Sequence, residues 1–223
     1  MIRINAIGHR FGMTWALRGV TAAAGAGEVV GLLGPNGCGK TTLLKILATR
    51  LNPTMGEGTI FGCDLRNDLQ PIRAQTEWLG HDLGLYKTLS GVENLEFASK
   101  IRGKKIAKEK MAAALDRVGL NGNRNKPVGS FSTGQKKRLA LARILLEQPK
   151  FILLDEPHTN LDKQGKGLMN ELIAEWKKER KTIWMASHDH KEILPLCDKA
   201  LVLNEGRAVY FGEAKTIPSN IQI

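Results

Sequence analysis

The chain has 223 residues, of which 42% are hydrophobic and 25% are charged, so it is long enough and apolar enough for one sizeable core. No stretch approaches the roughly 18 apolar residues that span a bilayer, and the first residues lack the apolar core of a signal peptide. We therefore expect a protein that is made and kept in the cytosol. Its three widely spaced cysteines are expected to be reduced thiols.

The formal net charge is +11, and the basic excess is concentrated between Lys100 and Lys150, where only Glu109, Asp116 and Glu147 are acidic. A basic surface suits nucleic acid, anionic lipid headgroups or anionic ligands. A solvated, lysine-rich helical face explains the same pattern, and the sequence leaves both interpretations open.

Short strands and helices alternate in the first and last thirds of the chain, which predicts a mostly parallel sheet covered on both faces. The segments predicted there are strand 29–33, helix 40–48, a short strand near 59–61, strand 77–80, strand 151–154, helix 165–180, strand 182–186, helix 191–197, and strands 200–203 and 208–211.

The middle third has a different pattern and is expected to form a helical lobe inserted into the sheet protein. Residues 92–118 are helical and lysine-rich with a break at Gly103, 121–130 form a loop, and 134–147 form a strong helix.

Residues 34–41 read GPNGCGKT and match the phosphate-loop pattern G-x-x-x-x-G-K-[ST] between a predicted strand and a predicted helix. Glycines let backbone N–H groups turn toward phosphates, and the helix N-terminus adds its positive dipole end. We expect Lys40 to reach the β- and γ-phosphates of a nucleotide and Thr41 to ligate Mg²⁺. The predicted phosphate-binding residues are Gly34, Pro35, Asn36, Gly37, Cys38, Gly39, Lys40, Thr41 and Thr42.

The apolar strand 151–154 ends in two carboxylates, Asp155 and Glu156. Ligands of open α/β sheets bind at the carboxyl ends of the strands, so both acids are expected to face the site of the phosphate loop. We expect Asp155 to hold Mg²⁺ through a water, and Glu156 to orient and deprotonate an attacking water.

Residues 131–135 read FSTGQ and resemble LSGGQ, the signature motif of the ABC ATPases, with departures at Phe131 and Thr133. A Lys-Lys-Arg helix follows the motif, and the Asp155-Glu156 strand comes shortly after it, in the order of that family.

Two further motifs carry the same resemblance, which covers essentially the whole chain. His188 after Ser187 resembles the switch histidine of the family, and Asn160-Leu161-Asp162 resembles its D-loop, with Asn160 in place of the usual small residue.

The resemblance implies that two copies pack head to tail, with each ATP between the phosphate loop of one copy and the signature of the other. Ser132 and Gly134 begin a helix and would offer a hydroxyl, a backbone N–H and a helix dipole to the partner's γ-phosphate. Gln135 and Asp162 belong to the same implied ATP-binding surface. The implied catalytic residues are Glu156 as base, His188 on the γ-phosphate, and Lys40.

An aromatic ring near the N-terminus commonly holds adenine in this family. Phe11 is at the matching place and Trp15 is the rival, since stacking requires only a π face.

ABC ATPases usually have a glutamine after the strand predicted at 77–80, where it touches Mg²⁺ and the water near the docking site of the membrane partner. Here the position holds His81, a further candidate for the nucleotide and metal site, which titrates near neutral pH. Gly80-His81 and the residues that follow resemble the haem-exporter ATPase of bacterial cytochrome c maturation.

The expected fold class is α/β: a P-loop NTPase core of the ABC ATPase type with an inserted α-helical subdomain and a small N-terminal β part. One domain is expected over 1–223, with the nucleotide-binding core at 1–87 and 150–223 and the helical signature subdomain at about 88–149.

The expected function is that of an ATP-hydrolysing transporter subunit that uses ATP and Mg²⁺, pairs with a second copy of itself and drives an integral membrane subunit. It would lie peripherally on the cytoplasmic side of the bacterial inner membrane. Other ABC exporters and a soluble ABC ATPase, as in Fe–S cluster assembly, remain alternatives. No nucleic-acid partner is expected, because the long coiled coils and paired ATPase domains of such relatives are missing from the sequence.

Overall fold

The computed structural model describes residues 1–221, so the last two residues of the predicted domain lie outside the described part. Its backbone contacts divide the chain into two compact units. The sheet unit comprises Met1–Trp78, Lys150–Pro157 and the chain from Leu172 onward, and the helical unit comprises Leu79–Pro149 and His158–Glu171.

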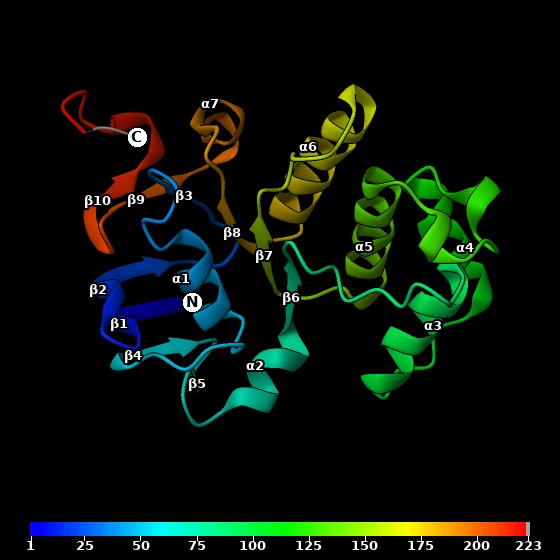
Figure 1. Ribbon diagram of the computed structural model, residues 1–223, viewed down its shortest axis with the longest axis horizontal. Helices are drawn as coiled ribbons and strands as arrows, with labels where there is room; N and C mark the ends of the chain where they lie inside the picture. Colours follow the sequence, from blue (N-terminus) through cyan, green and yellow to red (C-terminus); the bar gives the residue numbers. More distant parts are fainter. Residues whose placement is uncertain (222–223) are drawn as a thin grey trace. The chain divides into compact units, whose positions relative to one another are not determined.

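The main sheet of the sheet unit has six strands in the order β10-β9-β3-β8-β7-β6 (Figure 1). Strand β3 pairs in parallel with β8 and β9, β7 pairs in parallel with β8, and β10 pairs antiparallel with β9. All residues of β3, β7 and β8 are buried, which explains their continuous apolar sequences. The bounds are Val29–Leu33 (β3), Thr76–Leu79 (β6), Phe151–Asp155 (β7), Thr182–Ala186 (β8), Lys199–Asn204 (β9) and Arg207–Glu213 (β10).

A second, antiparallel sheet forms the N-terminal part, with strand order β2-β1-β4-β5. Its strands are Ile2–Phe11 (β1), Thr14–Ala24 (β2), Met55–Ile60 (β4) and Cys63–Asp64 (β5). Helix α1 (Lys40–Leu47) shares one apolar core with both sheets and lies beside them in Figure 1. This packing fixes the start of α1 next to the ends of the central strands.

The other helices of the chain include one correction to the sequence prediction. Helix α2 spans Leu69–Gln75 and α6 spans Lys163–Lys178. The predicted helix 191–197 is a single α-helical turn, α7 (His190–Ile193), followed by a 3₁₀ turn at Leu194–Leu196. Pro195 lies at the start of that turn, and its missing N–H cannot continue an α-helical ladder.

The helical unit contains α3 (Gly91–Ile101), α4 (Lys108–Arg117) and α5 (Thr133–Glu147). The predicted break at Gly103 is confirmed, and its φ of +70° is one that glycine adopts without strain. The predicted loop 121–130 contains two 3₁₀ turns, at Asn121–Asn123 and Val128–Ser130. No helix within residues 1–221 is long and apolar enough to cross a bilayer.

The buried β7–β8 pair gives a direct test of the core. Leu153 is fully buried and lies opposite Trp184 in the ladder. We expect Leu153→Ala to lower the free energy of unfolding by about 3 kcal/mol, because the substitution removes buried apolar contacts and leaves a cavity. Urea unfolding followed by circular dichroism measures the change. The control Val209→Ala, at an exposed position of β10, should change stability far less, and an equal loss would contradict this packing.

Candidate active site

The loop between β3 and α1 passes so close to neighbouring backbone at two positions that only glycine fits there. Gly34 has a φ of +129°, and a Cβ there would lie 2.1 Å from the carbonyl oxygen of Leu203. Gly39 has a φ of +111°, and its Cβ would lie 2.6 Å from the carbonyl oxygen of Ala16. The loop is therefore fixed against β9 on one side and β2 on the other.

The loop leads directly into the N-terminus of α1. Pro35, Asn36 and Gly37 are exposed, whereas Thr41 and Thr42 are half-buried in the first helical turn. The first N–H groups of any α-helix have no acceptor within the helix, and the dipole places partial positive charge there. This end of α1 therefore suits an anion, and phosphate above all.

Lys40 is folded back over the loop. Its Nζ donates hydrogen bonds to the carbonyl oxygens of Gly34 at 2.6 Å and Pro35 at 3.0 Å. The ammonium group is thus held at the same loop surface as the exposed backbone of residues 35–37, and an arriving phosphate would meet both.

Two oxygen groups from different elements meet beside this loop. The Thr41 hydroxyl donates to the carboxylate of Asp155, with oxygen–oxygen distances of 2.9 and 3.2 Å. Asp155 is the buried last residue of β7. No cluster of three or more His, Cys, Asp and Glu side chains with metal-site geometry occurs in residues 1–221. A hydroxyl and one carboxylate nevertheless fit Mg²⁺, which commonly takes few protein oxygens and completes its shell with water and phosphate.

Glu156 and His188 form the third part of the site. The Glu156 carboxylate accepts a hydrogen bond from the His188 backbone N–H at 2.9 Å and lies 2.9 Å from His188 Nδ1. Glu156 itself has a φ of +52°, and its N–H donates to the carbonyl oxygen of Ala186 at the end of β8. The end of β8 therefore orients the carboxylate that follows β7.

Sequence reasoning missed Ser187 as a member of this site. Its hydroxyl donates to Glu156 Oε2 at 3.3 Å and accepts from the Asp189 N–H at 3.0 Å. Its position could have indicated this role, because Ser187 directly follows a buried parallel strand and ligand sites lie at the carboxyl ends of such strands.

The signature residues lie in the helical unit and begin α5. Ser132 Oγ accepts from the Gln135 N–H, and Gln135 Oε1 accepts from the Ser132 N–H, which together form a capping box. Gly134 packs so closely that a Cβ would lie 3.0 Å from the Asn160 carbonyl oxygen. These residues line a hollow of about 450 Å³ together with Asp162.

Arg138 was not predicted as a site residue, yet it binds Asp162. Its guanidinium donates to Asp162 Oδ1 at 2.7 Å, and the Gly165 N–H donates to the same oxygen at 2.8 Å. The bond from Gly165, followed by that from Arg138, lowers the pKa of Asp162. The usable signal was the spacing: Arg138 follows Gln135 by three residues, so both side chains lie on the same face of the helix that begins at the signature.

Phe11 lies at the tip of the β1–β2 hairpin with 55% of its surface exposed. Its ring meets His9 edge to face, with ring centroids 4.6 Å apart. The same hairpin touches the phosphate loop through Ala16, whereas Trp15 is half-buried. Of the two candidates for stacking on adenine, Phe11 therefore has the more exposed ring.

His81 is exposed and belongs to the helical unit, whereas Thr41 and Asp155 belong to the sheet unit. The contacts of His81 with a nucleotide and with Mg²⁺ therefore stay a prediction.

The comparisons with known proteins agree on the family. The model of the ABC transporter family matches residues 17–159. The ABC transporter ATP-binding protein NatA of Bacillus subtilis (strain 168) is 35% identical over 207 residues, which cover 91% of this chain and 83% of NatA. Among eight such relatives the chain spans between 46% and 94% of the relative's length.

Solved structures share the fold. One described as the structure of the ATP-binding subunit of an ABC transporter has a TM-score of 0.89 and 25% identity, with 96% of this chain and 90% of that chain covered. The dimeric post-hydrolysis structure of the ATP-binding cassette MJ0796, bound to ADP and Pi, has a TM-score of 0.88 and 23% identity, with 97% and 100% covered.

The six-stranded sheet with its glycine loop defines an α/β P-loop fold of the ABC ATPase type, as predicted. The chain belongs to the ABC transporter family, as an ATP-binding, ATP-hydrolysing subunit.

We predict that the thiol of Cys38 in the phosphate loop reacts slowly with alkylating reagents. Burial raises the pKa of Cys38, against a smaller opposing effect of Lys40, and burial raises the pKa of Cys197 to about 12. The thiolate is the reactive form, so little of it is present at neutral pH. We expect a maleimide to label the half-buried Cys63 well before Cys38 or Cys197, as measured by mass spectrometry over time. Rapid labelling of Cys38 at pH 7 would contradict this assignment.

Proposed function

We propose that this chain binds Mg-ATP at the β3–α1 loop and hydrolyses it to drive a membrane transporter. The observation that carries the proposal is the meeting of Thr41 with Asp155 beside the loop, together with the Glu156–His188 pair at the next strand ends. Phosphoryl transfer depends mainly on positioning and charge neutralisation, and these groups supply both.

The phosphate loop would hold the nucleotide. Backbone N–H groups of the loop, apart from Pro35, which has none, and those at the start of α1 would bind phosphate oxygens, and Lys40 would exchange its carbonyl contacts for the β- and γ-phosphates. Thr42 adds a hydroxyl near the α-phosphate, and Phe11 offers its exposed ring to adenine. Thr41 and Asp155 would hold Mg²⁺, Asp155 through a water, and the ion neutralises phosphate charge when bound.

Glu156 would act as the general base toward the attacking water. An ionised carboxylate only accepts hydrogen bonds, so the short contact requires a proton on His188 Nδ1. With Nδ1 turned toward Glu156, Nε2 is the ring nitrogen left for the proposed contact with the γ-phosphate.

A second copy would complete each ATP site. Ser132, Gly134 and Gln135 begin α5, where a helix N-terminus faces a hollow that also borders Asp162. An ATP bound at the loop of one copy would meet this surface of the other in a head-to-tail dimer. The dimeric structure of MJ0796 supports this arrangement by analogy.

The proposed partner is a separate integral membrane subunit on the cytoplasmic side of a bacterial inner membrane. NatA is named as an ABC transporter ATP-binding protein, which supports this arrangement. A soluble ABC ATPase, as in Fe–S cluster assembly, is the alternative. Salt-resistant recovery of the native chain with membranes distinguishes the transporter subunit from the soluble ATPase.

The narrower proposal is a role in haem handling for cytochrome c maturation. It rests on His81 in the place of the family's glutamine and on the residues around it. Co-purification of polytopic cytochrome c maturation subunits with a haem absorption band would support it, and a different permease would exclude it.

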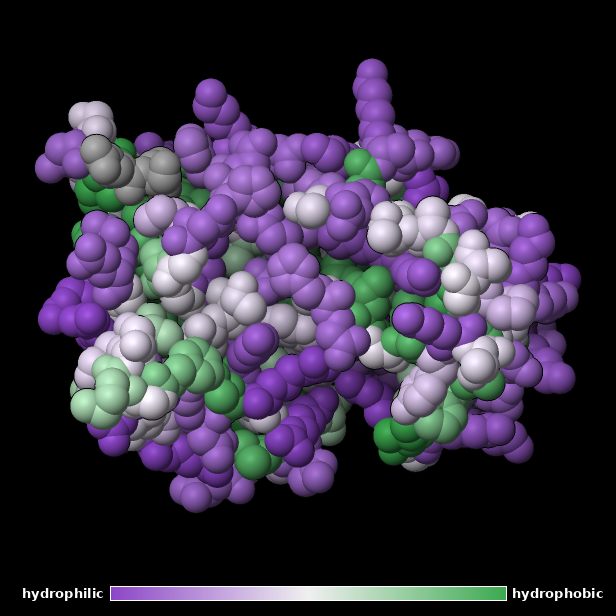
Figure 2. Space-filling view, viewed as in Figure 1, coloured by the Kyte–Doolittle hydropathy of each residue, from purple (hydrophilic) through white to green (hydrophobic). Residues whose placement is uncertain are grey.

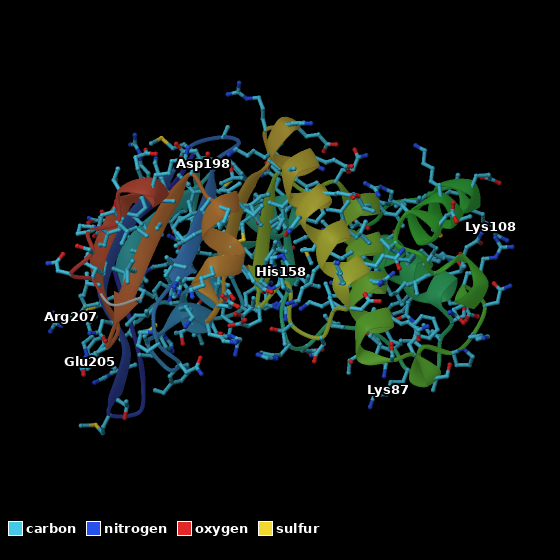
Figure 3. All side chains as sticks on the ribbon, turned by 90° about the horizontal axis from the view of Figure 1, so that it is seen from above. Lys87, Lys108, His158, Asp198, Glu205 and Arg207 are labelled. Carbon is cyan, nitrogen blue, oxygen red and sulfur yellow. The ribbon has the colours of Figure 1, made fainter. Side chains whose placement is uncertain are left out.

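The base assignment predicts a large loss of hydrolysis in Glu156→Gln. We expect kcat to fall by about 10²- to 10⁴-fold while ATP binding is kept, because the amide cannot take a proton. A phosphate-release assay and a nucleotide-binding assay measure the two effects. The control is Glu205→Gln. Glu205, which is labelled in Figure 3, is exposed in the turn between β9 and β10. Full hydrolysis in Glu156→Gln would exclude Glu156 as the base.

The His81 hypothesis predicts an altered pH–rate profile in His81→Gln. An imidazole can gain a proton and an amide cannot, so hydrolysis by the variant should depend less on pH. ATP hydrolysis measured from pH 5.5 to 8.5 with the membrane partner present tests it. An unchanged profile would remove His81 from the proposed site.

A further inference from the structure

A basic trough with an apolar floor lies between α3 and α4 of the helical unit. Its volume is about 660 Å³, and Ile106 and Met111 belong to its aliphatic lining. Four lysines lie along its rim: Lys100, Lys104, Lys105 and Lys108. Figure 3 labels Lys108, which lies at the start of α4 at the periphery of this unit. An apolar hollow edged by ammonium groups is complementary to an amphiphilic anion.

The rim carries more positive charge than its ion pairs neutralise. Residues 100–110 contain six basic side chains and one acidic side chain. Among the described ion pairs of this segment, Lys100 binds Glu96 at 2.8 Å, and Lys104 and Arg102 bind Glu147 at 2.8 and 3.8 Å. Lys105, Lys108 and Lys110 are exposed to solvent, so the trough keeps a positive field on its outer side.

The loop that bears these lysines is held in place by a buried carboxylate. Glu147, at the end of α5, is fully buried and accepts a hydrogen bond from Ser99 at 3.2 Å. Lys104 Nζ binds the Glu147 carboxylate and also its backbone carbonyl oxygen at 2.9 Å. The α3–α4 loop is thus anchored, and the trough is a formed feature of this unit.

Exposed apolar side chains also lie on α3, outside the residues that line the trough. Ile101 is 68% exposed and Phe97, one turn earlier, is 37% exposed. Figure 2 shows hydrophobic surface in this region of the helical unit, flanked by hydrophilic surface. Lysines around a protruding aliphatic side chain are the pattern of a protein surface that enters the headgroup layer of a membrane.

We propose that this trough docks the chain directly on an anionic phospholipid bilayer. The rim lysines lie against lipid phosphates, Ile101 enters the boundary between headgroups and acyl chains, and the aliphatic floor takes apolar lipid atoms. Each Lys near an anionic bilayer contributes favourably to binding, and the attraction is screened by salt.

The side chains favour lipid over two other anionic partners. Nucleic-acid grooves combine basic groups with aromatic rings on which bases stack, whereas the apolar side chains that line the trough, Val92, Ile106, Ala107 and Met111, include no aromatic ring. Arginine is the usual residue for planar, bidentate recognition of carboxylates, whereas lysine is a flexible point charge that follows mobile headgroups. The basic side chains that line the trough are all lysines, and one carboxylate, Glu96, lies among them.

This contact goes beyond the proposed function, because it involves lipid itself and requires no membrane subunit. It would keep the ATPase at the bilayer surface and raise its effective concentration near its partner. Its failure would leave ATP hydrolysis untouched, so the two proposals can be tested separately.

The test is co-sedimentation of the purified full chain with vesicles of phosphatidylcholine containing phosphatidylglycerol, compared with pure phosphatidylcholine. We expect binding to the anionic vesicles that weakens with added salt. The triple substitution Lys105→Glu, Lys108→Glu and Lys110→Glu should weaken binding by on the order of 100-fold. Carboxylates in the first turn of α4 also suit the helix dipole, so folding should be preserved.

The matched control is Lys178→Glu, Arg207→Glu and Lys215→Glu, three exposed positions of the sheet unit with the same change in net charge. The control should retain binding, and ATP hydrolysis should be similar in both triple variants. Ile101→Ser should weaken the binding that remains at high salt. Equal binding to both vesicle types, or equal losses in the two triple variants, would overturn the proposal, as would selective binding of nucleic acid in place of lipid.

Discussion

The close approach of the phosphate loop to the backbone of β9 is the constraint on which the site depends. At Gly34 a Cβ would lie 2.1 Å from the Leu203 carbonyl oxygen, a distance that no side chain can accept. Because the loop is pressed against this strand, it turns sharply out of β3 and delivers Lys40 and Thr41 at the start of α1. The positions of Lys40 and Thr41, the proposed phosphate and Mg²⁺ contacts of this loop, follow from that turn.

The parallel pairing of β7 with β8 assembles the rest of the site. The ladder places Asp155 opposite Ala186, so the residues that follow each strand emerge side by side. Glu156 adopts a left-handed conformation that costs on the order of 1–3 kcal/mol for a non-glycine residue. Hydrogen bonds to Ala186 and from His188 hold it there. These hydrogen bonds offset the strain and keep the carboxylate oriented.

The sequence predicted the features that depend on local patterns. The buried strands Val29–Leu33 and Thr182–Ala186 are found with the predicted bounds, because a continuous apolar run is typical of a strand with both faces covered. The glycine loop was recognisable because its spacing reflects the steric limits found at Gly34 and Gly39.

Features set by tertiary contacts were beyond sequence reasoning. The pairing of β1 with β2 and β4, the hydrogen bond from Ser187 to Glu156, and the bond from Arg138 to Asp162 depend on which segments meet in space. The predicted helix 191–197 was wrong because Pro195 interrupts the ladder after one turn. His81 is a local departure from a family pattern, and its role cannot be read from periodicity.

The central claim of this account is that two copies share each ATP site, with the loop of one facing the α5 start of the other. It is tested most directly by mixing two variants that are each inactive, Lys40→Ala and Gly134→Asp. The first loses the phosphate contact of the loop, and the second places a negative charge at the signature. In a mixed head-to-tail dimer, one site combines an intact loop with an intact signature. We predict that the mixture recovers ATP hydrolysis clearly above that of either variant alone, and a mixture no more active than the separate variants would contradict the shared site.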